Sequence, residues 1–544
     1  MSSSRSRFFS SLTALLFLAC ATPAWALEKW FYQPTNLAVD ANVDKIEALW
    51  KRAAAAGYTH VLLTDSKFCR LAEMGDRYFR NVEKVKAIAA KLNIEIVPAI
   101  FPVGYSNNLL GRDPNLVEGP PVKDVPLVVQ GGVARVDDAD APTLPGGDFS
   151  NLKKWTWRDE FIVLDGAAAR VSNAAGKNAR IVQQLKVKPW RQYHVSVRVK
   201  TQDFHGEPMI KVLPSKDDGR SLQWTNLGVK PTQDWTVHHV VFNSLGYDNV
   251  GLYFGMWPAG SGSLWWSDAK IEEVAFLNMT RRPGTPLVVK TADGKVLSEG
   301  KDFEPLSDPK MGQTPYAGEY DSWHEPPKLR TKLPDGTQLL ASYSHAATIY
   351  EHQAAMCLSE PKTYELLRDQ AKRVAAAWGA KAYMMSHDEL RVVNWCDTCQ
   401  SRHLTPGQML ADNMSKCVGI MHDIAPDARL YVWNDMFDPN HNAVPGPYYL
   451  VNGPFTGSWD GLPKSVTIMN WNSGKKDKSL QFFADRGNPQ IIAGYYDGPP
   501  EKIRDWLAAA KAIPGGVQGV MYTTWRNDYS QLEKFSALID EAGK

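Results

Sequence analysis

The strongest constraint on the fold is a rhythm of strand-like and helix-like segments that stops and later resumes. Three apolar segments, at residues 29–36, 59–65 and 94–105, alternate with two amphipathic helical patterns. From about residue 345 the same alternation continues through five more strand-like segments. Strands that alternate with helices predict parallel strands joined by crossover helices, and eight such units are the number that closes a barrel.

Between these two parts the pattern is of another kind. From about residue 126 to 280, short runs of alternating polar and apolar residues are separated by Gly, Asn, Asp and Pro. Such spacing predicts an antiparallel β-sandwich. The sequence thus predicts an α/β fold, a (β/α)₈ TIM barrel interrupted after its third strand by an all-β jelly-roll sandwich. The expected divisions are a signal peptide (1–26), the first part of the barrel (27–125), the inserted sandwich (126–280), a connector rich in Pro and Gly (281–344), and the rest of the barrel (345–544).

The charge balance excludes some classes of partner. Sixty-one Lys and Arg against 59 Asp and Glu give a net charge of +2, so no electrostatic case exists for nucleic acid or an anionic membrane. The 19 Trp and 20 Tyr are a more informative bias, because flat amphipathic rings suit the faces of sugars. We therefore expect a carbohydrate partner, an oligosaccharide or polysaccharide.

The N-terminus has the pattern of an export signal. Arg5 and Arg7 precede a short apolar run, and Ala24 and Ala26 offer small residues for cleavage. The run is too short for a permanent membrane span, and no later segment is typical of one. Cys20 raises a lipoprotein alternative, which is less favoured because of the residues that precede it. We expect a periplasmic or secreted protein.

Five cysteines follow the predicted signal. The odd number leaves at least one thiol unpaired within the chain. Cys396 and Cys399 have the spacing of a zinc half-site, but no second CxxC or HxxxH accompanies them. A local disulfide or plain thiols are therefore the favoured interpretation, and no metal or cofactor is predicted.

Polar and aromatic residues collect where the predicted barrel strands end. Active-site groups of such barrels project from the carboxyl ends of the strands. Carboxylates can move protons and stabilise an oxocarbenium ion, and rings stack on pyranose faces. Any one of these acids is as readily a helix cap, but the recurrence over several strands favours a shared sugar site. The candidates are Asp65, Asp388, Glu389, Trp433, Asp435, Trp471, Tyr496, Trp525, Asn527 and Asp528.

The order of these motifs resembles a known family. "YMMSHDE" (383–389), "VWNDMFD" (432–438), "NWN" (470–472), "YYDG" (495–498) and "TTWRND" (523–528) follow one another as in the catalytic barrel of the β-N-acetylhexosaminidases, glycoside hydrolase family 20. The resemblance covers roughly the last 190 residues. It implies a hydrolase that needs no protein nucleophile, because the 2-acetamido oxygen of the substrate attacks the anomeric carbon.

The resemblance also implies roles for individual residues. Glu389 is then the general acid and base, Asp388 holds the acetamido N–H, and Tyr496 donates to the acetamido carbonyl. An ionised Asp388 is expected to keep Glu389 protonated. The remaining members of the site are substrate-binding residues: Trp433, Asp435, Trp471, Trp525, Asp65 and Asn527.

The sequence departs from the family pattern at several strands. Ser386 and His387 replace two glycines, and Asp435 stands where Glu is usual. The first strand lacks the Arg with which the family binds the hydroxyls of the non-reducing-end sugar. These differences leave open another substrate, or attack inside a chain instead of at its end.

The predicted sandwich resembles carbohydrate-binding modules of the jelly-roll type. The segments that carry the likeness are 146–157, 181–201 and 262–274, which include a closing Trp-x-Asp strand. Candidate stacking rings are Trp155, Trp157, Trp224 and Trp257. The competing interpretation is that they pack in the sandwich core or against the barrel.

Two alternatives to the substrate-assisted hydrolase remain. One is a retaining glycosidase in which Asp435 or Asp528 is the nucleophile and Glu389 the acid. The other is a glycan-binding protein whose barrel has no catalytic activity.

Overall fold

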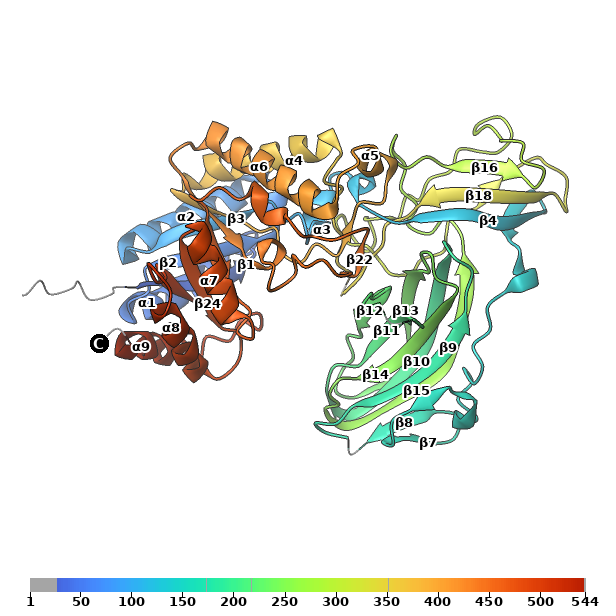
Figure 1. Cartoon of the computed structure of the whole chain (residues 1–544), viewed down its shortest axis with the longest axis horizontal. Coiled ribbons are helices and arrows are strands. Elements are labelled where there is room, and N and C mark those ends of the chain that lie inside the picture. Colours follow the sequence, from blue (N-terminus) through green and yellow to red (C-terminus); the bar gives the residue numbers. More distant parts are fainter. Residues whose placement is uncertain (1–26, 173, 217, 351, 543–544) are drawn as a thin grey trace, which may run out of the picture.

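The structure is a computed structural model that describes residues 27–542 except 173, 217 and 351. The predicted signal peptide lies outside the described residues. Within them, no helix combines the length and apolar character needed to cross a membrane. Figure 1 shows a helix-covered barrel at one end and antiparallel sheets at the other.

Eight parallel strands form a closed barrel, as the sequence predicts. Each strand is hydrogen-bonded to its two neighbours in parallel, and the last strand pairs with the first. In order around the barrel the strands are β1 (Glu28–Thr35), β2 (His60–Asp65), β3 (Glu95–Ile100), β19 (Ala382–Met385), β21 (Arg429–Trp433), β23 (Thr467–Asn470), β24 (Gln490–Tyr495) and β25 (Gly519–Thr523).

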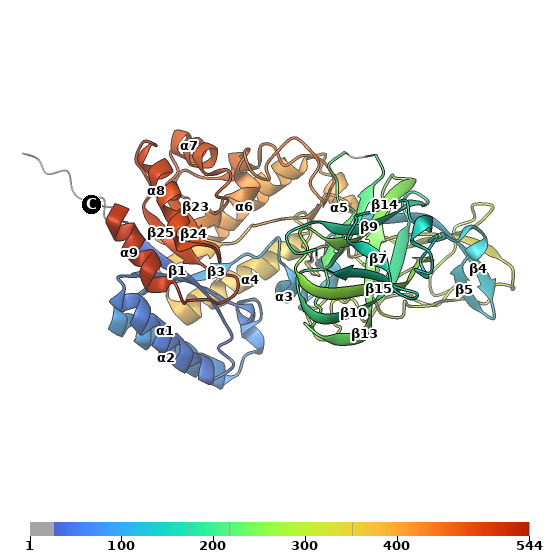
Figure 2. The same cartoon turned by 90° about the horizontal axis from the view of Figure 1, so that it is seen from below.

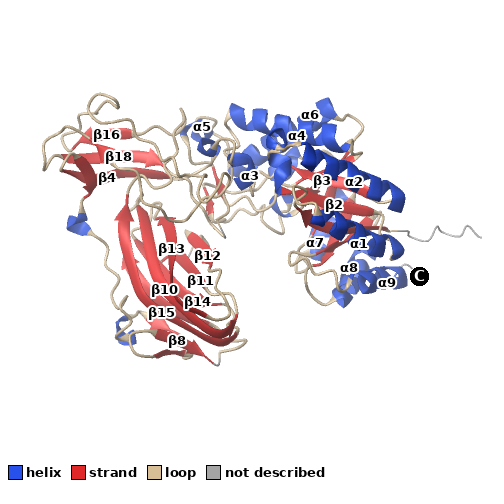
Figure 3. Cartoon of the chain, turned by 180° about the vertical axis from the view of Figure 1, so that it is seen from behind, coloured by secondary structure: helices blue, strands red, loops and turns tan. Residues whose placement is uncertain are grey.

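Amphipathic helices cover the outside of the barrel, as Figure 3 shows. Along β1, Trp30 points into the barrel, whereas its neighbour Phe31 packs outward on Trp50 of α1. This alternation is the period of two that a strand imposes on its side chains. The helices are α1 (Ala41–Ala55), α2 (Asp76–Leu92), α4 (Pro361–Trp378), α6 (Pro406–Ile424), α7 (Lys476–Arg486), α8 (Ile503–Lys511) and α9 (Leu532–Ala542).

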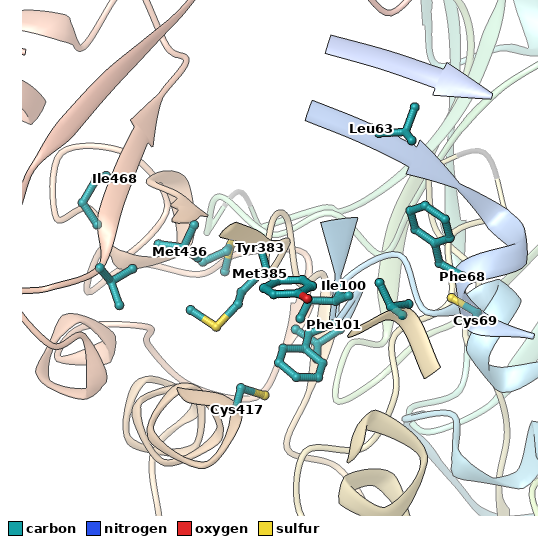
Figure 4. Close-up of a cluster of buried hydrophobic side chains, with 14 of the residues drawn as sticks. Leu63, Phe68, Cys69, Ile100, Phe101, Tyr383, Met385, Cys417, Met436 and Ile468 are labelled. Atoms are coloured by element: carbon teal, nitrogen blue, oxygen red, sulfur yellow. The ribbon is translucent and has the colours of Figure 1, made fainter. Parts of the chain in front are cut away.

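The layer between strands and helices is a large apolar core, part of which Figure 4 shows. Phe68, Phe101 and Met385 are buried there beside Cys69 and Cys417. A rigid core at this place holds the strand ends, and therefore the loops that follow them, in fixed positions.

The chain leaves the barrel after β3 and returns at β19, which pairs with β3 at Ala99–Met384 and Ile100–Met385. Two five-stranded antiparallel sheets between these strands share one apolar core. One sheet has the order β13 (Gln233–Asn243), β10 (Gln192–His205), β15 (Ser261–Val274), β8 (Ala169–Ser172) and β7 (Ile162–Leu164). The other has the order β12 (Gln223–Asn226), β11 (Met209–Pro214), β14 (Asn249–Met256), β9 (Ala179–Lys186) and β6 (Trp157–Arg158).

A third antiparallel sheet includes strands from residues 281–344, where the sequence predicts a connector. Strands from that segment pair with residues 121–136, and the sheet has its own core around Leu127, Leu339 and Tyr343. Figure 2 shows β4 and β5 at the end of the molecule farthest from the barrel helices. Pro and Gly residues are typical of the turns of a small sheet as well as of a linker, so the composition of this segment does not distinguish the two. The order is β16 (Val288–Thr291), β18 (Gln338–Ser344), β4 (Pro121–Gln130), β5 (Val133–Val136) and β17 (Leu329–Arg330).

Short elements complete the described chain. The helices α3 (Asn107–Leu110) and α5 (Asp397–Gln400) lie near the junction between the barrel and the sheets (Figure 1), where β20 (Val392–Val393) pairs in parallel with β22 (Leu450–Val451).

Candidate active site

A cavity of about 620 Å³ opens at the carboxyl ends of the barrel strands. Six of the residues predicted for the site line it, and they come from β19, β21, β23, β24 and β25 or the loops that follow. The lining consists of Tyr32, Leu62, Thr64, Ala99, Pro102, Tyr105, Tyr350, Met384, Ser386, Asp388, Glu389, Trp433, Trp471, Tyr496 and Trp525.

The loop after β19 presents Asp388 and Glu389 to this cavity on an unusual backbone. His387 has φ 57° and Glu389 φ 45°, left-handed values that are rare for residues other than glycine. The His387 ring is fully buried and shares a 3.0 Å hydrogen bond with Asn413 Oδ1 of α6. Burial and this hydrogen bond fix the His387 side chain in the turn before the acid pair. Strain of this kind persists where the surroundings impose it, most often at functional sites.

Two donors converge on the Glu389 carboxylate. Tyr105 donates its hydroxyl hydrogen to Glu389 Oε2 at 2.5 Å, and the buried Arg391 forms an ion pair with the same oxygen at 2.7 Å. Arg391 is itself held by Gln353 and lies over the Tyr350 ring, 4.3 Å from its centroid. Glu389 therefore faces a cation and a hydroxyl donor, in contrast to the expected arrangement in which a charged Asp388 is its main partner.

The pKa values of the other two carboxyls of the site are raised. Burial, with Asp435 and Glu389 nearby, raises the pKa of Asp388 to about 8. Burial and Glu389 raise the pKa of Asp435 to about 7. Asp435 lies beneath the cavity, where its carboxylate accepts the Glu389 backbone N–H at 3.0 Å and the Asn442 amide at 3.0 Å. At neutral pH its raised pKa keeps Asp388 protonated, whereas the sequence predicts an ionised Asp388.

The aromatic residues form one continuous wall. The rings of Trp471 and Tyr496 stack with centroids 5.6 Å apart and an interplanar angle of 6°. Trp525 meets Tyr496 edge-on at 5.8 Å and lies 6.4 Å from Trp433. Tyr496 and Trp525 are partly exposed at the rim, 37% and 47% respectively, so ring faces remain open to a ligand. Tyr496 lies in a run of three residues with positive φ, 495–497, a second strained turn at this cavity.

Four predicted residues do not line the cavity: Asp435, which lies beneath it, Asp528, Asp65 and Asn527. Asp65 ends β2, but its carboxylate is buried and accepts hydrogen bonds from the Leu37 and Lys67 N–H groups and the Tyr78 hydroxyl. It is a cap of the following turn, the structural alternative that applies to any acid at a strand end. Asn527 is exposed with φ 56° and does not belong to the cavity lining.

Several residues of the site were not among the predicted ones. Arg391 stands two positions after Glu389, and Tyr105 ends the third strand-like segment, so both had a positional signal. Tyr350 comes from the chain that returns to the barrel, far from any barrel strand in the sequence. Only the fold brings it to the cavity.

Aromatic residues of the inserted sheets fall into two groups. Trp155 is buried and stacks on Phe149 at 4.9 Å, so it belongs to the sandwich core. Trp224 is partly exposed, with the Lys211 ammonium 3.6 Å from its centroid, and lies 6.1 Å from Tyr350 of the cavity. One face of the β12–β11–β14–β9–β6 sheet therefore continues toward the mouth of the barrel.

The remaining two candidates differ in environment. Trp157 is 45% exposed and carries the Arg180 guanidinium over its ring at 4.8 Å. Trp257 is partly exposed beside Tyr253 and Lys211. Asp268, which closes the predicted Trp-x-Asp strand, is ion-paired with Arg198 at 3.0 Å.

Comparison with known proteins gives structural neighbours only. No protein-family model matches the chain, and no curated protein matches it. Among solved structures, a rhamnosidase from Novosphingobium sp. PP1Y is similar over 96% of this chain and 59% of its own, at 11% identity and a TM-score of 0.36. A family 4 carbohydrate-binding module is similar over 25% of this chain and 91% of its own, at 17% identity and a TM-score of 0.18. A family 16 module covers 26% of this chain and 98% of its own, at 13% identity and a TM-score of 0.18. Because these scores are below 0.5, we base the function on the geometry of the site.

Proposed function

We propose that this protein is an exported glycoside hydrolase that cleaves N-acetylhexosamine-containing glycans. The observation that carries the proposal is the cavity in which Asp388 and Glu389 face a wall of Trp433, Trp471, Tyr496 and Trp525. Adjacent carboxyls supply the proton transfer that a glycosidic bond needs, and ring faces bind pyranoses. We assign the architecture to a TIM barrel with a jelly-roll insertion, and the expected location is the periplasm or the exterior.

The proposed reaction is substrate-assisted. The acetamido carbonyl oxygen attacks C1 as the glycosidic C1–O bond breaks, and Glu389 gives its proton to the leaving oxygen. The Asp388 carboxylate accepts the acetamido N–H and stabilises the positive oxazolinium, while Tyr496 donates to the acetamido oxygen. Glu389 then removes a proton from the water that attacks C1, and the sugar leaves with its configuration retained.

The resting enzyme holds the required proton on the neighbouring acid. In the empty cavity Asp388 is proposed to hold this proton, because burial raises its pKa to about 8, while Arg391 forms an ion pair with Glu389. Moving it to Glu389 when the acetamido group binds changes no net charge. The active form is then the one in which this proton is retained.

A panel of aryl β-glycosides tests the proposal directly. Turnover of the N-acetylglucosaminide or N-acetylgalactosaminide, with no turnover of the glucoside or galactoside, supports a role for the acetamido group. A thiazoline analogue of the oxazoline should then inhibit. Turnover without thiazoline inhibition favours a protein nucleophile instead. Neither Asp435 nor Asp528 lines the cavity, but Asp435 accepts the Glu389 backbone N–H and is the nearer candidate. Binding of glycans without turnover of aryl glycosides or natural polymer favours a non-catalytic glycan-binding protein.

The proton on Asp388 predicts the alkaline side of the pH profile. Since the pKa of Asp388 is raised to about 8, the pair keeps its proton at neutral pH and loses it above about pH 8. We expect kcat/KM to fall about tenfold per pH unit beyond that point. The measurement is a profile of kcat/KM in which the stability of the enzyme is checked at each pH.

The Asp388→Asn variant separates this explanation from general alkaline inactivation. Because the group with the raised pKa is then missing, the alkaline limb near pH 8 should disappear in this variant. A limb that stays in place in the variant contradicts the assignment of this proton to Asp388.

The face of the sandwich that adjoins the cavity is proposed to guide a polymeric substrate. Trp224 and Lys211 on this face lie next to Tyr350 at the cavity. Trp224→Ala should raise KM for a polymer several-fold and leave kcat and KM for a small aryl glycoside unchanged. Trp157→Ala, on the far edge strand β6 of the same sheet, is the matched comparison and should have the smaller effect. Equal KM values for the polymer in wild type and Trp224→Ala would refute this path.

A further inference from the structure

Four buried side chains that can each offer one metal ligand meet at the junction of the barrel and the sheets. The Sγ atom of Cys357 lies 3.6 Å from that of Cys396 and 3.4 Å from that of Cys399. Glu118 Oε2 lies 3.3 Å from Cys399 Sγ and 3.8 Å from Cys396 Sγ. All four ligand atoms lie within 4.8 Å of one another.

Two regions of the chain hold these groups in register. Val117 and Met356 form an antiparallel bridge, and Cys357 N donates to Leu116 O while Glu118 N donates to Ala355 O, both at 2.8 Å. This pairing places Glu118 and Cys357 side by side, although 238 residues lie between them in the sequence. Cys396 is the N-cap of α5 and Cys399 lies within its single turn, where a Cys-x-x-Cys spacing turns both thiols to the same side.

Glu118 is oriented as a ligand with one free oxygen. Its Oε1 accepts the backbone N–H groups of Trp395 and Cys396, at 2.9 and 3.0 Å. Its Oε2 is left to face the thiols of Cys396 and Cys399. A carboxylate fixed in this way by backbone donors needs no rearrangement to bind a metal through one oxygen.

The surroundings suit a cation. The four residues are at most 1% exposed, and burial raises the pKa of Glu118 to about 7. Arg282 is buried and held by Glu360 and by the Val117 carbonyl, so it offsets part of the negative charge of thiolate ligands.

We propose that Glu118, Cys357, Cys396 and Cys399 bind a structural zinc ion. With Zn–S bonds near 2.3 Å, a tetrahedral site has sulfur atoms about 3.8 Å apart, close to the separations here. Three thiolates and one carboxylate complete four-coordination and leave no open position, as in structural zinc sites. The zinc ion would fasten the point where the chain leaves the barrel to the point where it returns.

A disulfide is the chemical competitor. Cys357 faces both Cys396 and Cys399. Any one disulfide would therefore leave the third thiol and the Glu118 carboxyl without a bond to a sulfur or a metal. A zinc ion uses all four groups and releases the thiol protons on binding.

The test is the metal content of the full-length protein purified after growth with added zinc. We expect about one zinc ion per chain, near-background content in Cys357→Ser and Cys399→Ser, and full content in Cys417→Ser. Cys417 is the control because its thiol is also buried but lies on α6, outside the cluster. Removing zinc from the wild type with a strong chelator should lower Tm, and adding zinc back should restore it.

Cobalt substitution keeps the test independent of how well the variants fold. The wild type refilled with Co²⁺ should show the intense visible bands of a tetrahedral ion and a sulfur-to-cobalt charge-transfer band. Wild-type protein without bound metal, with Cys357 in a disulfide or with thiols that are alkylated equally before and after chelation, would overturn the proposal. Full zinc content in both Cys→Ser variants would do the same.

Discussion

Replacing Glu389 by glutamine is expected to lower kcat for an N-acetylhexosaminide by roughly 10²–10⁴-fold. The amide keeps the shape of the side chain and can still accept hydrogen bonds from Tyr105 and Arg391, but it cannot give a proton to the leaving oxygen. KM should change much less, because the aromatic wall is untouched. Steady-state kinetics on an aryl glycoside and on one with a better leaving group measure the effect. The loss should be smaller with the better leaving group, which needs less protonation.

Asp477→Asn is the control for removing a carboxylate. Asp477 is exposed on the first turn of α7 and does not line the cavity, so its loss should leave kcat and KM unchanged. A Glu389→Gln enzyme with wild-type kcat would exclude Glu389 as the general acid. It would leave Asp388, whose pKa is raised to about 8, as the remaining acid in contact with the cavity.

Replacing Gly104 by alanine is expected to damage both the site and the fold. A Cβ on residue 104 would lie 1.9 Å from the Asp388 carbonyl oxygen and 3.3 Å from the Glu389 carbonyl carbon. Gln353 donates to the carbonyls of both Gly104 and Glu389, so the two segments cannot separate without breaking this link. We expect a loss of about 1–3 kcal/mol in the free energy of unfolding. Displacing the acid pair by about 1 Å should lower kcat/KM about 10²-fold.

Gly419→Ala is the matched control, for which we expect a change in stability of the opposite sign. Gly419 lies on the exposed side of α6 with no atom within 4 Å of an added Cβ. Alanine there should stabilise the helix by about 0.5–1 kcal/mol and leave activity unchanged. Thermal unfolding and kcat/KM of the two variants, measured together, distinguish a steric effect at the site from a general effect of losing a glycine. A Gly104→Ala enzyme with wild-type Tm and kcat/KM would contradict this prediction, because the loop after β19 would then accommodate the methyl group with no loss of stability or activity.

The barrel was predictable because each of its strands carries a local signal. The apolar segments around Trp30, Leu62, Met384 and Ile491 are framed by helical patterns, and this local alternation fixes the fold class. The small third sheet was not predictable in the same way. Its strands β4 and β18 pair although more than 200 residues separate them in the sequence, and the segment between β16 and β17 has the composition of a loop.

The acid pair and the aromatic wall were predictable from their positions at strand ends, but charge states were not. Asp65 and Asp388 both follow buried strands, yet one is enclosed by backbone N–H donors and the other faces a cavity. The contact of Arg391 with Glu389, and the position of Asp435 beneath the pair, depend on how loops fold back. The cysteine cluster shows the same limit, because Glu118 and Cys357 join the Cys-x-x-Cys pair through long-range packing.

The long excursion between β3 and β19 also dictates when the barrel can close. As the chain emerges, the outer strands β1 and β3 both lack a final partner, because β3 pairs with β19 and β1 meets β25 only after residue 519. At about 5–20 residues per second, this waiting time is on the order of tens of seconds. The antiparallel sheets, which are complete by residue 344, can fold within it. The late joining of the two barrel edges therefore makes folding slow and gives an aggregation-prone intermediate a long life, so the yield of this protein should depend strongly on chaperones that shield open strand edges.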